Sequence, residues 1–190
     1  MEPLPKSGTP KLTREEAEKI VTNKLGAAAP TPVLIGVRGY YSKMGVEGKN
    51  DTNIYDDAII VLGKDYQTFN ANTDPSFVKK EGRALAFIKE GVYKFAKGKH
   101  KNKYNALRAY PEGVEIPCVR DGKTSTAQYI NIHMGGEVGK DTTWSEGCQT
   151  VPKRQWNKFI ELVYSEMNRV KAPTITYILI TNEEMKKILG

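Results

Sequence analysis

One histidine and one cysteine stand close together in the last third of the chain, in a stretch rich in glycine. His133 is followed by Met134-Gly135-Gly136, and Cys148 comes 15 positions after the histidine, within Trp144-Ser145-Glu146-Gly147-Cys148-Gln149. A cysteine attacks an amide carbonyl as its thiolate, and a neighbouring imidazole can take the thiol proton and later give it to the leaving amine. The pair predicts cysteine-dependent acyl transfer, with Cys148 as nucleophile and His133 as acid and base.

The residues around this pair have types that suit the same chemistry. Gly147 lets the backbone approach a substrate, and the amides of Gly147 and Cys148 are predicted to hold the oxyanion. Ser145 is predicted to orient the loop or the imidazole, since no Gly-x-Ser-x-Gly elbow surrounds it. A backbone carbonyl after His133 could fix the tautomer of its ring, so the design needs no carboxylate. A helix starting just behind Cys148 would favour the thiolate.

At these residues the chain resembles the catalytic domain of L,D-transpeptidases, whose signature is a histidine, a loop of similar length and then Ser/Thr-His-Gly-Cys. The matching positions are His133, Ser145, Gly147 and Cys148. The resemblance implies a β-rich, sandwich-like fold and a Cys–His pair assisted by a backbone carbonyl. It also implies a peptidoglycan stem peptide containing meso-diaminopimelate as the acyl donor.

The chain departs from that signature on both sides of Gly147. Glu146 stands where the family usually has histidine, and Gln149-Thr150 stands where it usually has an aliphatic residue and a substrate-binding arginine. Lys153 or Arg154 could supply the missing positive charge. Ser-x-Gly-Cys-Gln is similar to hydrolytic relatives among phage lysis proteins and wall-attacking effectors, so we expect a peptidase, with cross-linking or amino-acid exchange as the alternative.

The remaining candidate residues surround this motif or form separate constellations. Candidate substrate contacts are Trp144, Glu146, Gln149, Arg154 and Tyr93. A rival zinc site would use His100, Cys118, His133 and Cys148, but their spacing is not the short paired pattern of structural zinc, and no metal or cofactor is expected. The lysine-rich stretch at 94–103 leaves open a non-catalytic module that binds wall polymer or nucleic acid.

Composition limits the class of protein. At 190 residues, 39% of them hydrophobic, the chain predicts one core, and it has no apolar run near the roughly 20 residues of a membrane span. The net charge of +7 favours contact with polyanions, which include nucleic acid, anionic membrane surfaces and bacterial wall polymers. Of these, the resemblance implies peptidoglycan, and nucleic acid is not the expected partner. Two cysteines do not make a disulfide framework, so two free thiols are expected. The first thirty residues lack the apolar core of a secretory signal, so we expect a protein that is made in the cytoplasm and acts on the wall after release or delivery. We also expect it to be a monomer.

The elements that must position the pair follow from the hydrophobic pattern. Residues 1–30 are predicted to be an arm and a helix, opened by a capping box at Thr13-Arg14-Glu15-Glu16, and residues 31–190 an α+β, β-rich catalytic domain. A helix is predicted after Cys148, and a short charged helix at the end of the chain. The predicted strands are Val33–Tyr41, Ala58–Leu62, Ala84–Ile88, Gly91–Phe95, Val114–Val119, Gln128–His133 and Thr174–Thr181, with a tight turn at Asp121-Gly122.

Overall fold

The computed structural model of the chain describes residues 4–5, 8–41, 52–76, 84–137 and 143–190. Its helices are α1 (Arg14–Leu25), α2 (Lys153–Arg169) and α3 (Asn182–Leu189). Its strands are β1 (Val33–Arg38), β2 (Asp57–Leu62), β3 (Tyr66–Ala71), β4 (Phe87–Ile88), β5 (Gly91–His100), β6 (Tyr104–Ala109), β7 (Ile116–Arg120), β8 (Lys123–Ala127), β9 (Asn131–Gly135), β10 (Gln149–Pro152) and β11 (Thr174–Thr181). The predicted α+β, β-rich class is confirmed.

Eight strands form one sheet that curls until its two edges nearly meet. Their order is β10-β9-β6-β5-β11-β1-β2-β3, and β4-β7-β8 form a separate small sheet. Asn72, just after β3, exchanges both backbone hydrogen bonds with Thr150 of β10, at 2.9 and 2.8 Å. This bridge joins the segment after β3 to the strand that follows Cys148.

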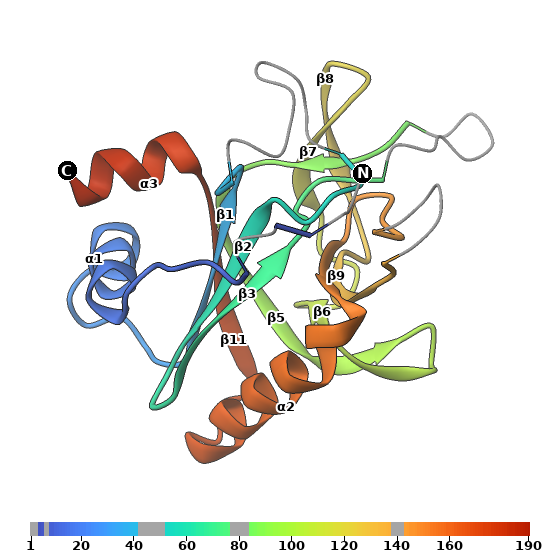
Figure 1. Cartoon of the computed structure of the whole chain (residues 1–190). Helices are drawn as coiled ribbons and strands as arrows, with labels where there is room; N and C mark the ends of the chain where they lie inside the picture. Colours follow the sequence, from blue (N-terminus) through green and yellow to red (C-terminus); the bar gives the residue numbers. More distant parts are fainter. Residues whose placement is uncertain (1–3, 6–7, 42–51, 77–83, 138–142) are drawn as a thin grey trace.

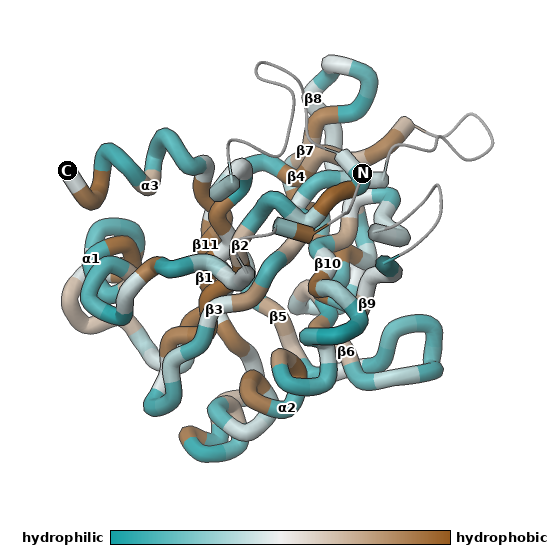
Figure 2. Tube along the Cα trace, viewed as in Figure 1, coloured by the Kyte–Doolittle hydropathy of each residue, from teal (hydrophilic) through white to brown (hydrophobic). Residues whose placement is uncertain are grey.

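The central strands are buried on both faces, which explains their continuous apolar sequences. In β1, Leu34 packs into the cluster inside the curled sheet, whereas Val33 and Ile35 pack outward with Ile20 and Val21 of α1. Alternate residues of a strand point to opposite faces, so a strand covered twice needs apolar residues throughout. Figure 1 shows α1 and α3 side by side against this outer face, and Figure 2 shows the apolar colouring of the central strands.

The helices begin and end largely where the sequence predicts. The capping box of α1 is present, with the Thr13 side chain on the Glu16 amide and the Glu16 carboxylate on the Thr13 amide. The apolar stripe of α2 is buried in the inner cluster, where Trp156, Phe159 and Val163 lie. Within the described ranges, no helix combines the length and apolar character needed to cross a bilayer.

One predicted position is wrong in a way that matters for the chemistry. α2 does not start just behind Cys148, because the strand β10 lies between them and the helix begins at Lys153. Four residues ending in proline gave no strand signal, but the backbone of β10 pairs in parallel with β9. The helix N-terminus therefore is not what would stabilise a thiolate at Cys148.

The strand predictions hold for the apolar strands and fail for the polar ones. The predicted Thr174–Thr181 is β11, the Asp121-Gly122 turn has positive φ at both residues, and Ala84–Ile88 shrinks to β4. The strands β3, β6, β8 and β10 were not predicted. The predicted Gln128–His133 is displaced to β9, which places His133 inside a strand rather than at its end.

Candidate active site

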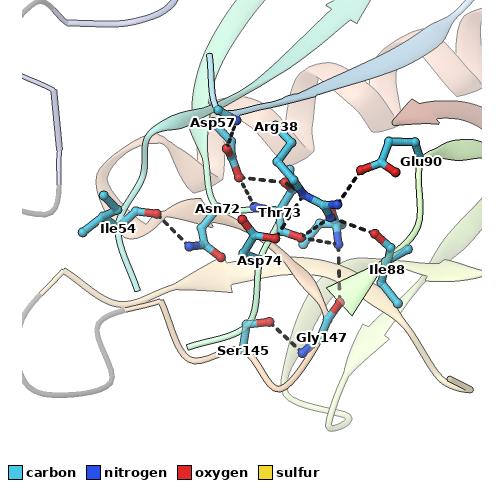
Figure 3. Close-up of polar contacts among 12 residues, drawn as sticks. Arg38, Ile54, Asp57, Asn72, Thr73, Asp74, Ile88, Glu90, Ser145 and Gly147 are labelled. Atoms are coloured by element: carbon cyan, nitrogen blue, oxygen red, sulfur yellow. Dashed lines mark hydrogen bonds and ion pairs between the residues drawn. The ribbon is translucent and has the colours of Figure 1, made fainter. Parts of the chain in front are cut away.

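The segment that carries Cys148 is held in place by Ser145. The Ser145 N–H donates to Ser76 Oγ at 2.8 Å, and the Ser76 N–H donates to the Ser145 carbonyl at 2.6 Å. The Ser145 hydroxyl donates to the Cys148 carbonyl at 2.5 Å. It also accepts the Gly147 N–H at 3.0 Å (Figure 3). Ser145 therefore fixes the loop, one of its two predicted roles, and it engages the Gly147 amide that was predicted to face an oxyanion. Of the predicted amide pair, the Cys148 N–H is left for that task.

Gly147 is the tightest point of this loop. Its φ is +150°, and a Cβ added there would lie 2.8 Å from the Ala86 carbonyl oxygen. Such a φ is strained for any residue with a side chain, and the backbone at Ala86 cannot yield as a flexible side chain could. The glycine therefore brings the loop against the chain that precedes β4.

The Gly147→Ala variant is expected to lose about 3 kcal/mol of unfolding free energy, from backbone strain and from overpacking. Urea denaturation checks this. The matched control is Gly113→Ala, where φ is +77° but nothing lies within 4 Å of the added Cβ. The control should lose about 1 kcal/mol from strain alone. Equal losses in the two variants would mean that the contact with Ala86 does not matter.

Gln149 has a different role from the predicted one. It is 1% exposed, and its side-chain amide donates to the Thr73 carbonyl at 3.3 Å and to the Gly147 carbonyl at 3.4 Å. Its side-chain carbonyl accepts the Tyr177 hydroxyl at 3.0 Å. Because Gln149 is buried and its side chain bonds to Thr73, Gly147 and Tyr177, it supports the cysteine loop instead of contacting substrate.

A network of charges centred on Arg38 adjoins Gln149 through Thr73, and no sequence pattern predicted it. Its carboxylates Asp57 and Asp74 are buried, whereas Glu90 is exposed. Arg38 pairs with Asp74 at 3.0 Å and with Glu90 at 2.8 Å, and it also donates to the carbonyls of Thr73 and Ile88. Asp57 accepts the Thr73 N–H and hydroxyl at 2.5 and 2.7 Å. Figure 3 shows Arg38 between Asp57 and Glu90. Thr73 thus connects this network to Gln149 and the cysteine loop.

His133 is buried on β9 with its tautomer set by the backbone. The ring is 2% exposed, and Nδ1 lies 2.8 Å from the Met134 carbonyl, so Nδ1 carries the hydrogen and Nε2 keeps its lone pair. Burial lowers the pKa of His133 to about 3, and the charges of His100 and Lys101 act in the same direction. The histidine is therefore a neutral base at physiological pH, as the predicted backbone carbonyl requires.

A second histidine stacks on this ring. His100, at the end of β5, lies with its ring centroid 4.1 Å from that of His133 at an interplanar angle of 21°. The Asn131 amide lies 3.5 Å from His100 Nδ1. The sequence predicted His100 only as a zinc ligand or as part of the basic stretch, and its stacking on His133 depends on a hairpin that no local pattern indicated.

Cys148 lies against β9, where its sulfur contacts Asn131, two residues before His133. The Asn131 N–H donates to Cys148 Sγ at 3.4 Å, and two residues along a strand span about 7 Å. Burial, with a smaller effect of Glu146, raises the pKa of the thiol to about 11. No hydrogen bond joins the His133 ring to this sulfur among the described residues. Their shifted pKa values keep both the thiol and the imidazole neutral at pH 7.

Tyr104 lies next to the pair. Its hydroxyl donates to the Met134 carbonyl at 3.4 Å, the same carbonyl that accepts from His133. Burial and the nearby Cys148 raise the pKa of Tyr104 to about 12. A free-enzyme pair of this kind is often loose and tightens when substrate binds.

Cys148 opens onto a pocket of about 270 Å³. The pocket is lined by Ala84, Leu85, Ala86, Arg120, Ala127, Gln128, Tyr129, Ile130, Glu146, Gly147 and Cys148. Glu146 and Gly147 were predicted here. Arg120 and Tyr129 were not, because the hairpin that carries Arg120 and the segment that carries Tyr129 gave no chemical signal in the sequence.

Three predicted substrate contacts lie outside that lining. Trp144 is 49% exposed on the surface, and Arg154 pairs with Glu137 at 3.0 Å at the start of α2. Tyr93 on β5 donates its hydroxyl to the Lys89 carbonyl at 2.6 Å. Neither Lys153 nor Arg154 lines this pocket, so the predicted replacement for the family's substrate-binding arginine is not found in the lining.

The zinc alternative brings together only part of its four residues. His100 stacks on His133, but Cys118 is fully buried in the inner core, and both cysteines are free thiols as predicted. In the ranges that the structure covers, no three His, Cys, Asp or Glu side chains are grouped to hold a metal ion.

The geometry thus supplies a thiol at a pocket wall, a neutral imidazole on β9 and a hydrogen-bonded turn at Ser145–Cys148 that holds the thiol. Comparison of the chain with protein-family models, with curated proteins and with solved structures found no match.

Proposed function

We propose that this protein is a cysteine peptidase that cleaves peptidoglycan stem peptides through an acyl-enzyme on Cys148, with a fold of the L,D-transpeptidase type. The observation that carries the proposal is the joint position of Cys148 and His133. The sulfur lies at the wall of a pocket, and the imidazole has its Nδ1–H held by the Met134 carbonyl and its Nε2 free to accept a proton. The nearly closed sheet with α2 packed on it is compatible with the proposed fold.

The neutral pair can carry out both halves of hydrolysis. His133 Nε2 takes the thiol proton as sulfur bonds to the substrate carbonyl carbon, and the carbonyl electrons move onto oxygen near the Cys148 N–H. The C=O bond reforms, the C–N bond breaks, and the imidazolium gives its proton to the leaving amine. Water, deprotonated by His133, then attacks the thioester, and the sulfur leaves and regains the proton.

The substrate and setting belong to the same proposal. We propose bacterial peptidoglycan containing diaminopimelate as the substrate, attacked by a monomer after release or delivery. The net charge of +7 supports an approach to an anionic wall. Lys101, at the turn between β5 and β6, adds positive potential near the pair, since its charge lowers the pKa of both His133 and Cys148.

Digestion of purified diaminopimelate-type peptidoglycan tests the proposal. Wild-type protein and Cys148→Ala are incubated with the polymer, and the released fragments are identified by mass spectrometry. We expect shortened stem peptides with the wild-type protein and not with Cys148→Ala, and the masses of these peptides identify the bond that is cleaved. New dimers of higher mass would instead mean that an amine accepts the acyl group, as in a transpeptidase.

Unchanged polymer in both samples would overturn the proposal that the protein is a peptidoglycan peptidase. In that case a non-catalytic module using the lysines of 94–103 becomes the explanation to test. Binding to anionic polymer that falls steeply with salt and survives Cys148→Ala would identify it.

A further inference from the structure

The pocket beside Cys148 is lined mainly by small or apolar groups. Ala84, Leu85 and Ala86 come from the segment before β4, and Ala127 and Ile130 from the chain around the end of β8. Among the described lining residues, Arg120 and Glu146 alone carry a formal charge. One positive and one negative group thus share a pocket of about 270 Å³ with the thiol.

Neither charge is neutralised within the described protein. Arg120 donates from Nη1 to the Ala84 carbonyl at 2.5 Å, and neither side chain forms an ion pair with a described residue. A guanidinium has five N–H donors in a planar fork, and a carboxylate can take two of them together. The bond to Ala84 holds the Arg120 side chain at the pocket and leaves donors free.

The position of Glu146 makes it the complementary group. It directly precedes Gly147 in the rigid loop, and its backbone carbonyl accepts the Ala86 N–H at 3.0 Å. Its charge acts on Cys148, whose pKa it helps to raise. A negative group this close to the nucleophile disfavours the thiolate. Glu146 therefore does not activate the sulfur, and a role in binding substrate explains its position better.

We infer that this pocket binds the zwitterionic head of an amino-acid residue in the acyl donor, with the head's carboxylate on Arg120 and its ammonium beside Glu146. The inference rests on the proposed function and names the group that the site selects. Arg120, from β7, then supplies the positive charge that is absent after Cys148.

This pairing discriminates between stem peptides by charge. A diaminopimelate side chain ends in a carbon that carries both ammonium and carboxylate, and so offers both charges at one place. A lysine side chain offers the ammonium alone and provides no carboxylate for Arg120. Diaminopimelate amidated at that carboxylate loses the same contact, so both analogues should bind more weakly than the free zwitterion.

Binding to the inactive Cys148→Ala protein tests the inference without turnover. Three soluble stem tripeptides are titrated by calorimetry, ending in diaminopimelate, in its side-chain amide and in lysine. The diaminopimelate peptide is expected to bind about tenfold more tightly than either analogue, the effect of about 1.4 kcal/mol for one charge-assisted contact. Equal affinity for the three peptides would overturn the inference.

Variants of the two pocket charges identify the residues. In the Cys148→Ala background, Arg120→Gln should weaken binding of the diaminopimelate peptide about tenfold and leave the amide nearly unchanged, while Arg120→Lys should lose less. Glu146→Gln should weaken all three peptides, since each carries the ammonium. Arg154→Gln is the matched control, because this exposed arginine pairs with Glu137 outside the pocket lining and should not affect binding.

The outcomes separate this inference from the proposed function. Charge-selective binding without Cys148-dependent cleavage would overturn the proposed peptidase function and still support recognition of the zwitterion by the pocket. Cleavage that is unaffected by Arg120→Gln, and that is equally fast for stem tetrapeptides with diaminopimelate, its side-chain amide or lysine at the third position, would support the peptidase and overturn the proposed role of the pocket.

Discussion

At pH 7 the His133→Gln variant is expected to form the acyl-enzyme about 10⁴-fold more slowly than the wild-type protein. Without the imidazole, the thiol must lose its proton to solvent. With a thiol pKa of about 11, only about one molecule in 10⁴ carries a thiolate at pH 7. In the wild type, His133 Nε2 removes this requirement because it takes the proton during the attack.

The pH dependence distinguishes this role from a structural one. With pKa values of about 3 for His133 and about 11 for Cys148, base and thiol are both in their working forms across the neutral range, so the wild-type rate should be nearly flat from about pH 5 to 9. The rate of His133→Gln should rise about tenfold per pH unit over the same range, since the thiolate fraction rises so.

Single-turnover kinetics with a stem-peptide ester measures this step directly, and circular dichroism at each pH confirms that both proteins stay folded. His100→Gln is the matched control, because it removes the other ring of the stack and leaves His133 in place. The control should remain nearly flat with pH. A His133→Gln rate that is within tenfold of wild type, or that does not change with pH, contradicts the assignment of His133 as base.

The sequence predicted the parts of the site that depend on neighbouring residues. His133, Ser145, Gly147 and Cys148 lie within 16 positions, and their types state their chemistry without knowledge of the fold. The helix α1 was equally local, because its capping box is a pattern of four residues. The same holds for the Asp121-Gly122 turn, where two residues determine the backbone conformation.

The elements that were missed depend on partners far along the chain. In β3 the polar side chains Gln67, Thr68 and Asn70 hide an ordinary strand, and Thr68 and Asn70 bond to backbone carbonyls near the start of the chain. The strand β10 is short and ends in Pro152, and it exists because β9 and Asn72 flank it. Backbone pairing of this kind leaves little trace in local sequence.

The buried charges were hidden for the same reason. Arg38 and its partner Asp74 stand in separate segments of the sequence, and each looks like a solvated surface charge until the fold brings them together. Arg120 likewise looked like part of a polar hairpin, and its place in the pocket depends on the segment at Ala84 and the cysteine loop. Long-range geometry, rather than residue type, makes these groups part of the site.

The Arg38→Met variant is expected to lose about 3–5 kcal/mol of unfolding free energy, because it removes the positive charge beside the buried carboxylates of Asp57 and Asp74. Methionine keeps most of the side-chain volume, so the loss reports charge rather than a cavity. Urea denaturation at pH 7 measures it. Arg108→Met is the matched control, since its pair with Glu112 at 2.8 Å is exposed and worth less than about 1 kcal/mol.

The penalty of Arg38→Met should shrink as the pH falls from 7 to 5. Burial already raises the pKa of Asp57, and Arg38 acts in the opposite direction, so removing Arg38 raises this pKa further. The folded variant then binds more protons than its unfolded chain, and its stability relative to wild type must increase toward acid pH. The double variant Arg38→Met/Asp57→Asn should recover part of the lost stability at pH 7. A loss of unfolding free energy that does not change with pH and is not relieved by Asp57→Asn would mean that lost packing at Arg38, and not lost charge, causes it.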